Sequence, residues 1–250
     1  MSTPVEPALG APAGPRWRAR RLDPDRALGL RLTVAAVAAF LVLVPFALLA
    51  VLVVGEWGPL HRLDLAVTDT LHTDVAQHPA MVRAMVVWCE VFDPNSLRVA
   101  ALVLVIWLVR RGAPRMAVWV TTTMAVGGLL GVLLKLLVGR NRPELLDPVA
   151  RAAGYSFPSG HALNAALAAG VFLLVFLPLA GARRYLLWAA AILVTVVTGL
   201  CRIALGVHWA SDVAGGWILG AAVVAATAAA FATWRHRPAR RPRADRPSTR

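Results

Sequence analysis

The sequence predicts an all-α membrane protein, a bundle of six transmembrane helices. Of the 250 residues, 58% are apolar and 16% are charged, with a mean hydropathy of +0.65. A soluble domain is nearer ~45–50% apolar and ~25% charged, and a disordered chain lacks this excess of apolar residues. Several apolar runs approach the roughly 20 residues that a helix needs to cross a bilayer. Composition therefore excludes a soluble enzyme and a disordered binding protein.

The predicted spans follow one another along the chain with short connections. Five runs are long enough to cross or nearly cross a bilayer: Leu32–Val54, Met116–Leu134, Ala162–Ala182, Tyr185–Cys201 and Val213–Trp234. The run Val99–Val109 is shorter and is bounded by Arg98 and Arg110. It becomes a sixth span, beginning near Pro94, if Arg98 extends its charged head to the membrane interface. The alternative for this run is a buried or re-entrant segment.

Arginine placement favours six spans with both termini in the cytoplasm. Residues 1–31 hold six arginines and residues 235–250 hold seven. Six spans put both tails on one side, together with five arginines of the 2–3 and 4–5 connections: Arg110, Arg111, Arg115, Arg183 and Arg184. That side then carries 18 of the 26 basic residues, which the positive-inside rule assigns to the cytoplasm. The opposite connection, residues 55–96, has two arginines and six acidic residues.

Residues 32–234 are predicted to form one domain between two disordered, basic cytoplasmic tails. The tails are rich in Pro, Ala and Arg with little apolar periodicity. Beside a membrane span, such tails are expected to meet anionic lipid headgroups rather than nucleic acid. In the outer segment, Met81–Phe92 has two charges on one face and apolar residues elsewhere, which predicts an interfacial helix.

The ionisable residues near the bilayer gather in three short segments, and residues of this kind are costly there unless they serve a function. The segments are Lys135-x6-Arg142-Pro143, Pro158-Ser159-Gly160-His161 and Arg202-x5-His208-x3-Asp212. In the six-span arrangement all three lie at the outer face. Lys135, Arg142 and Arg202 are cations suited to phosphate oxygens. The free N–H groups at the start of the helix that follows Ser159 and Gly160 also favour an anion.

The third segment adds a candidate nucleophile. His208 and Asp212 are four residues apart and share one face of a helix. A carboxylate on one imidazole nitrogen fixes the tautomer and leaves the other nitrogen free to attack phosphorus. His161 is then placed to protonate the leaving oxygen. Taken singly, Ser159 could be only a helix N-cap and His208–Asp212 a surface ion pair, so the prediction depends on the joint arrangement.

Two further arginines, Arg140 and Arg151, are interpreted as ordinary contacts with lipid headgroups.

The order and spacing of the three segments resemble the signature of the type 2 phosphatidic acid phosphatase superfamily, the lipid phosphate phosphatases related to vanadium haloperoxidases. The resemblance covers about residues 32–234 and implies a six-span core with an outward active site. It implies that His208 forms a phosphohistidine, that Asp212 orients it and that His161 protonates the leaving group. It also implies that no metal or cofactor is needed and that five residues hold the phosphate: Lys135, Arg142, Ser159, Gly160 and Arg202.

The function implied by this resemblance is a plasma-membrane, metal-independent lipid phosphatase that works at the extracytoplasmic face. The substrates implied are a polyprenyl diphosphate such as undecaprenyl diphosphate, phosphatidylglycerol phosphate or phosphatidic acid. The Arg-over-Lys bias suggests a GC-rich bacterium and modestly favours the polyprenyl substrate. Two alternatives stay open: a phosphotransferase that uses the same phosphohistidine, and a non-catalytic lipid-phosphate binder or transporter. The binder would have no need of the His208–Asp212 pair.

One position departs from the family pattern, because Cys201 stands where the third motif usually has serine. A thiol is a weaker hydrogen-bond donor than a hydroxyl, while the nucleophile, its carboxylate and the cations are all present. We therefore expect Cys201→Ser to keep or modestly raise the rate of phosphate release from a lipid phosphate. A collapse of turnover in this variant would reveal an unrecognised role for the thiol.

Overall fold

The computed structural model describes residues 40, 42–144 and 153–234, and within these ranges the chain forms helices and turns without a strand. A first helical segment, Val42–Val54, precedes the labelled helices. These are α2 (Gly58–Ala76), α3 (Pro79–Val91), α4 (Pro94–Arg110), α5 (Pro114–Val138), α6 (Gly160–Phe176), α7 (Arg184–Ala204) and α8 (Ala210–Trp234). Two short 3-10 turns, Leu177–Leu179 and Gly181–Arg183, connect α6 to α7. The predicted tails lie outside the described residues.

Between four and six membrane spans fit the described helices. Four segments are long and apolar enough to cross a membrane alone, and they contain α5, α6, α7 and α8. Two bent pairs qualify only when each is counted as one span: Val42–Val54 with α2, bent by 92°, and α3 with α4, bent by 40°. The chain is therefore a multi-pass, all-α membrane protein, as predicted. The short run Val99–Val109 lies in α4, which begins at Pro94 as the six-span arrangement requires. Asp93, just before this helix, accepts a hydrogen bond from the Asn95 N–H at 2.8 Å.

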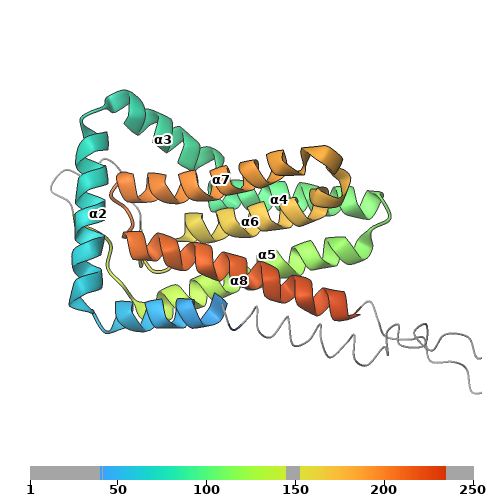
Figure 1. Ribbon diagram of the computed structural model, residues 1–250, viewed down its shortest axis with the longest axis horizontal. Coiled ribbons are helices and arrows are strands. Elements are labelled where there is room, and N and C mark those ends of the chain that lie inside the picture. The colour runs from blue at the N-terminus through green and yellow to red at the C-terminus, as the bar shows by residue number, and fades with distance from the viewer. Residues whose placement is uncertain (1–39, 41, 145–152, 235–250) are drawn as a thin grey trace, which may run out of the picture.

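Helix α6 lies in the middle of the bundle, with α7 and α8 on either side of it (Figure 1). It also contacts α4 and α5. Most of its side chains are buried and small or aliphatic, among them Ala162, Leu163, Ala165, Leu167, Ala168 and Val171. Because the second motif begins at the first turn of α6, this central position brings the motif beside the other two.

Glycines on the neighbouring helices let them approach α6 closely. A Cβ at Gly131 of α5 would lie 2.5 Å from a methyl carbon of Leu163. A Cβ at Gly216 of α8 would lie 2.8 Å from the backbone oxygen of Ser159, and one at Gly220 would lie 2.6 Å from the Cβ of Ala166. Small residues spaced four apart are a common means of close helix packing in membranes. Here they bring the start of α8 against the start of α6.

Helix α2 crosses the end of the bundle, beside the ends of α7 and α8 (Figure 1). Its buried face is polar and includes Asp64, Thr68 and His72, whereas Leu63 and Leu65 on other faces are exposed. The His72 ring nitrogen Nδ1 lies 3.1 Å from the Ala204 carbonyl oxygen at the end of α7. No helix was predicted at this position from the sequence. Its polar residues Asp64, Thr68 and His72 face the protein.

The segment expected to form an interfacial helix, Met81–Phe92, is helical with slightly different limits, as α3. It bends by 40° into α4 instead of standing alone. Its last turn buries Cys89, which packs with Cys201 and Leu205 of the α7 end. Helix α3 therefore joins the bundle through its C-terminal end.

The close approach of α8 to α6 predicts that Gly216→Ala destabilises the protein by about 1–3 kcal/mol, because the new methyl group would press on backbone atoms that cannot rotate away. Gly128→Ala is the matched control, since its nearest neighbour is an Arg98 side-chain nitrogen at 4.0 Å. Thermal unfolding in detergent should show a lower Tm for Gly216→Ala than for the control. Equal Tm values would mean that the packing tolerates the methyl group.

Candidate active site

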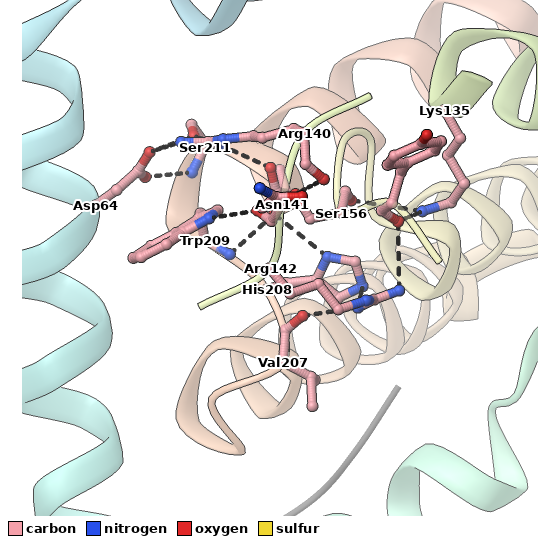
Figure 2. A network of polar contacts seen from close by, with 12 residues as sticks. Asp64, Lys135, Arg140, Asn141, Arg142, Ser156, Val207, His208, Trp209 and Ser211 are labelled. Atoms are coloured by element: carbon pink, nitrogen blue, oxygen red, sulfur yellow. Dashed lines mark hydrogen bonds and ion pairs between the residues drawn. The ribbon is translucent and has the colours of Figure 1, made fainter. Parts of the chain in front are cut away.

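The three sequence motifs meet at the end of the bundle that α2 crosses, and Figure 2 shows the contacts between residues of the first and third. Helix α5 ends at Gly139, whose φ of 64° is a left-handed conformation that glycine adopts without strain. The chain then leaves the helix and is fixed to the segment before α6. The Ser156 N–H donates to the Arg140 carbonyl at 2.8 Å, and the Ser156 hydroxyl donates to the Asn141 carbonyl at 3.0 Å. These bonds hold residues 140–142 beside the second motif.

His208 lies in the turn between α7 and α8 and is only 2% exposed. Its Nδ1 is 3.4 Å from the Asp212 carboxylate, and its Nε2 is 3.1 Å from Nη1 of Arg142. Because a carboxylate only accepts hydrogen bonds, Nδ1 is assigned the proton and Nε2 the lone pair. Both members of the pair are buried, so this is not the surface ion pair that the sequence alone allowed.

Burial lowers the pKa of His208 to about 4. The hydrogen bond and the charge of Asp212 act in the opposite direction, and the charges of Arg142 and Arg202 add to the lowering. The imidazole is therefore neutral near pH 7, with an unprotonated Nε2 directed at Arg142. This is the protonation state that a nucleophilic histidine requires.

Arg142 and Lys135 are held by backbone carbonyl groups rather than by carboxylates. Arg142 donates to the carbonyls of Val207 at 2.7 Å and of Gly154 at 2.8 Å. Lys135 donates to the carbonyl of Tyr155 at 2.7 Å. Burial and the neighbouring Arg202 lower the pKa of Arg142, a sign that positive charge is concentrated here. Carbonyl partners orient these cations and leave their charge available to an anion.

Arg202, near the end of α7, completes the positive cluster. It is 9% exposed, and its Nε has no hydrogen-bond partner among the described residues. The charges of Arg142 and Arg202 both act on Lys135 and on His208, so the predicted cations converge around the predicted nucleophile. Buried like charges repel one another, and a bound phosphate would relieve that repulsion.

The second motif contributes a buried hydroxyl group. Ser159 precedes the first turn of α6, but its side chain makes no capping hydrogen bond, and its Oγ is buried without a partner in the described part of the chain. The simple N-cap interpretation is therefore wrong. The Ser159 N–H donates to the Asp212 backbone carbonyl at 2.9 Å and is not free for an anion. An unsatisfied buried hydroxyl is costly, and a phosphate oxygen would satisfy it.

Gly160 and His161, also of the second motif, lie beside the cluster of cations. A Cβ at Gly160 would lie 4.0 Å from Cε of Lys135, so the lysine side chain passes over the start of α6. His161 has its Nε2 3.6 Å from a carboxylate oxygen of Asp93, which begins α4, and the charges of Arg202 and Arg142 act on its ring. Asp93 lies outside the three motifs, and sequence reasoning missed it.

Arg140 is not the lipid-headgroup contact that the sequence analysis assigned. Its side chain is 14% exposed and forms ion pairs at 2.7 Å with both Asp64 and Asp212. It also donates to the Ser211 hydroxyl at 2.7 Å. Asp64 lies on α2, far from the motifs in sequence, so no local pattern linked it to the site. Arg151 lies outside the described residues.

A cleft of about 460 Å³ opens beside this network. Its apolar wall comes from the Val42–Val54 segment, and its polar wall includes Arg140 and Arg142. Trp209 lies between the cleft and the buried network, with its ring beside His61 and its indole N–H donating to the Asn141 carbonyl at 3.0 Å. Because Arg142 lines the cleft and also contacts His208, the cleft approaches the nucleophile.

Comparison with known proteins gives matches in both sequence and structure. The model of the PAP2 superfamily matches residues 116–236. Phosphatidylglycerophosphatase B of Bacillus subtilis strain 168 is 38% identical over 95 residues, which are 37% of this chain and 46% of that protein. Undecaprenyl-diphosphatase of Sulfolobus acidocaldarius is 31% identical over 120 residues, 45% of this chain and 54% of that protein. The matched part is thus about half the length of these relatives.

The fold is shared with a crystal structure of a transmembrane PAP2-type phosphatidylglycerolphosphate phosphatase from Bacillus subtilis. The TM-score is 0.69 at 20% identity, and the match covers 80% of this chain and 98% of that one. The family match over residues 116–236 includes all three motifs, whose residues lie close together in the structure. Sequence, fold and site therefore agree that this chain is a multi-pass membrane protein of the PAP2 superfamily.

Proposed function

We propose that the protein is a membrane hydrolase that removes the terminal phosphate from a lipid phosphate or diphosphate through a phosphohistidine on His208. The observation that carries the proposal is the buried, neutral His208, with Nδ1 toward Asp212 and Nε2 beside Arg142. The names of both matched relatives describe phosphatases of lipid substrates. Candidate substrates are phosphatidylglycerol phosphate, a polyprenyl diphosphate and phosphatidic acid.

The geometry supports two chemical steps. In the first, Nε2 of His208 attacks phosphorus, the bond to the lipid oxygen breaks, and His161 donates a proton to that oxygen. The His208 ring, now bonded to phosphorus, becomes positively charged, and the Asp212 carboxylate balances this charge. In the second, His161 accepts a proton from a water molecule that attacks phosphorus. The bond to Nε2 breaks and inorganic phosphate leaves.

Phosphate binding is assigned to the three cations Lys135, Arg142 and Arg202, with the Ser159 hydroxyl and the backbone at Gly160. Three fixed positive charges can neutralise a phosphate group and stabilise the charge that spreads over its oxygens in the transition state. The unpaired Ser159 Oγ and Arg202 Nε supply additional donors. This charge arrangement supports a reaction that does not depend on a metal ion.

The proposed topology has six spans, cytoplasmic termini and a site at the extracytoplasmic face of the plasma membrane. The arginine distribution supports this orientation. The cleft supports lateral access by a lipid, because one wall is apolar and the other carries Arg140 and Arg142. A headgroup could reach the cations while its hydrocarbon chain stays beside the Val42–Val54 segment. The basic tails would then lie near anionic lipids of the cytoplasmic leaflet.

The proposal predicts phosphate release that resists EDTA and requires His208. We would measure inorganic phosphate released from detergent-solubilised phosphatidylglycerol phosphate, undecaprenyl diphosphate and phosphatidic acid, with EDTA present. His208→Ala should reduce turnover to background, because the attacking nitrogen is gone. His78→Ala is the control, since the ring of that exposed histidine bonds to the Asp74 carbonyl and lies outside the three motifs. Full activity in His208→Ala, or loss of wild-type activity in EDTA, would contradict the proposal.

The alternatives give different results in the same assay. A phosphotransferase would pass phosphate from His208 to an added alcohol such as glycerol in preference to water, so phosphorylated glycerol would exceed free phosphate. A non-catalytic binder would release no phosphate, and His208→Ala would leave its lipid affinity roughly intact.

The low pKa of His208 predicts how the activity depends on pH. The nucleophile should stay neutral down to about pH 4, and activity that depends on it should fall below that value. Arg142 helps to keep this pKa low, so Arg142→Gln should raise it and move the acid limb of kcat/KM to higher pH. The pH profiles of wild type and Arg142→Gln should be measured on the same lipid, because ionisation of the substrate then affects both profiles equally. An acid limb that is unchanged or lower in the variant would contradict this assignment.

A further inference from the structure

We propose that Asp64 and Arg140 are positioning residues, which hold the Asp212 carboxylate in the orientation that fixes His208. This inference rests on the proposed function, because it assigns Asp64 and Arg140 a role in the reaction of His208. Asp64 lies outside the three motifs, and Arg140 occupies one of the unspecified positions of the first.

The two carboxylate oxygens of Asp212 have different partners. Oδ1 accepts a hydrogen bond from Nη1 of Arg140 at 2.7 Å. Oδ2 accepts one from the Trp209 backbone N–H at 2.9 Å and lies 3.4 Å from Nδ1 of His208. Rotation of the carboxylate would break the Arg140 contact. Arg140 therefore determines which Asp212 oxygen faces the His208 ring. The contact between that oxygen and Nδ1 in turn fixes the direction of Nε2.

Arg140 is in turn fixed by Asp64 and Ser211 (Figure 2). Its Nη2 donates to Oδ2 of Asp64 at 2.7 Å, and its Nη1 donates to the Ser211 hydroxyl at 2.7 Å. Asp64 also accepts from the Ser211 N–H at 2.8 Å and from the Ser211 hydroxyl at 2.6 Å. These bonds close a ring of Asp64, Arg140 and Ser211, so the guanidinium cannot swing away while α2 is in place.

The charges of this group suit the proposed covalent step. Two buried carboxylates, Asp64 and Asp212, share the one cation Arg140, which leaves a net charge of −1 while His208 is neutral. When phosphorus bonds to Nε2, the ring gains a positive charge and the group becomes neutral. Arg140 therefore supplies the positive charge that both carboxylates contact, including the Asp212 carboxylate that faces the ring.

Asp64 cannot act by touching substrate, because its side chain is 1% exposed and lies behind Arg140 and Ser211. Simple stability is a poor explanation for the ion pairs, since apolar side chains often serve a buried position as well or better. A positional role explains why the chain of contacts ends on Asp212, whose carboxylate faces the candidate nucleophile His208.

The first test compares turnover with substrate binding in Arg140→Gln and Asp64→Asn. We expect kcat to fall about 10- to 100-fold, as small misplacements of reacting groups do. KM and the inhibition constant for inorganic phosphate should stay within about threefold, because the side chains that hold phosphate are unchanged. Arg140→Lys should recover part of the loss, since lysine keeps the charge but lacks the fork that reaches both carboxylates.

The double variant Asp64→Asn/Arg140→Gln tests whether Asp64 acts through Arg140. If it does, the double variant loses no more kcat than Arg140→Gln alone. Losses that multiply would overturn the proposal, as would a kcat for Arg140→Gln within threefold of wild type. The double variant also removes both charges, so no unpaired charge is buried. Ser211→Ala is milder still and should lower kcat with KM unchanged, because one hydroxyl of the ring is lost and both charges stay.

Asp69→Asn and Arg83→Gln are the matched controls, since both side chains are exposed on α2 and α3 respectively, and both variants should keep wild-type kcat. Thermal unfolding and elution in detergent establish that each variant is folded. His208→Ala separates the two proposals. If it remains active, the phosphohistidine function fails. If it is inactive while the Asp64, Arg140 and Ser211 variants match wild type, only the positioning role fails.

Discussion

Asp212 is bonded to three of the segments that build the site, and the geometry of the site depends on it. Its backbone carbonyl accepts from Ser159 at the start of α6, and its side chain accepts from Trp209, contacts His208 and pairs with Arg140. One buried residue thereby connects the end of α5, the start of α6 and the turn before α8. Such a group is stable in the interior only while its partners remain bonded to it. The candidate nucleophile, the cations and the helix ends are consequently fixed together.

The apolar bundle makes this concentration of charge possible. Helix α6 is surrounded by aliphatic side chains, and glycines of α5 and α8 let the backbones approach it closely. The second and third motifs begin their helices at this close contact, where Gly216 lies against the Ser159 carbonyl. The rest of the interior offers few polar partners, so the carbonyl groups after α5 and before α6 become the ligands of Lys135 and Arg142. Packing of small residues thus determines where the cations converge.

The apolar helices and the contact between His208 and Asp212 could be predicted from the sequence, because both depend on local patterns. Runs without charges mark α5 to α8, and the spacing of His208 and Asp212 places both on one helical turn. Helix α2 was missed because its buried face is polar, and a polar segment between apolar runs is typical of a solvent-exposed connection. Arg140 was misinterpreted because its partner Asp64 lies 76 residues away, and the spacing of residues within a short motif cannot indicate so distant a pair. Ser159 carries a further ambiguity, since the same residue type serves as a cap or as a ligand.

The position of α2 affects how sequence variation in this protein should be interpreted. Asp64 lies outside residues 116–236, the part that the family model matches, yet it is bonded to Arg140 inside that part. A functional domain limited to the matched residues would therefore omit Asp64, the carboxylate that pairs with Arg140. Chimaeras that exchange the N-terminal helices between relatives would have to exchange Arg140 with them. Substitutions on the buried face of α2 deserve the same scrutiny as those in the motifs, although in the sequence they resemble changes in an ordinary loop.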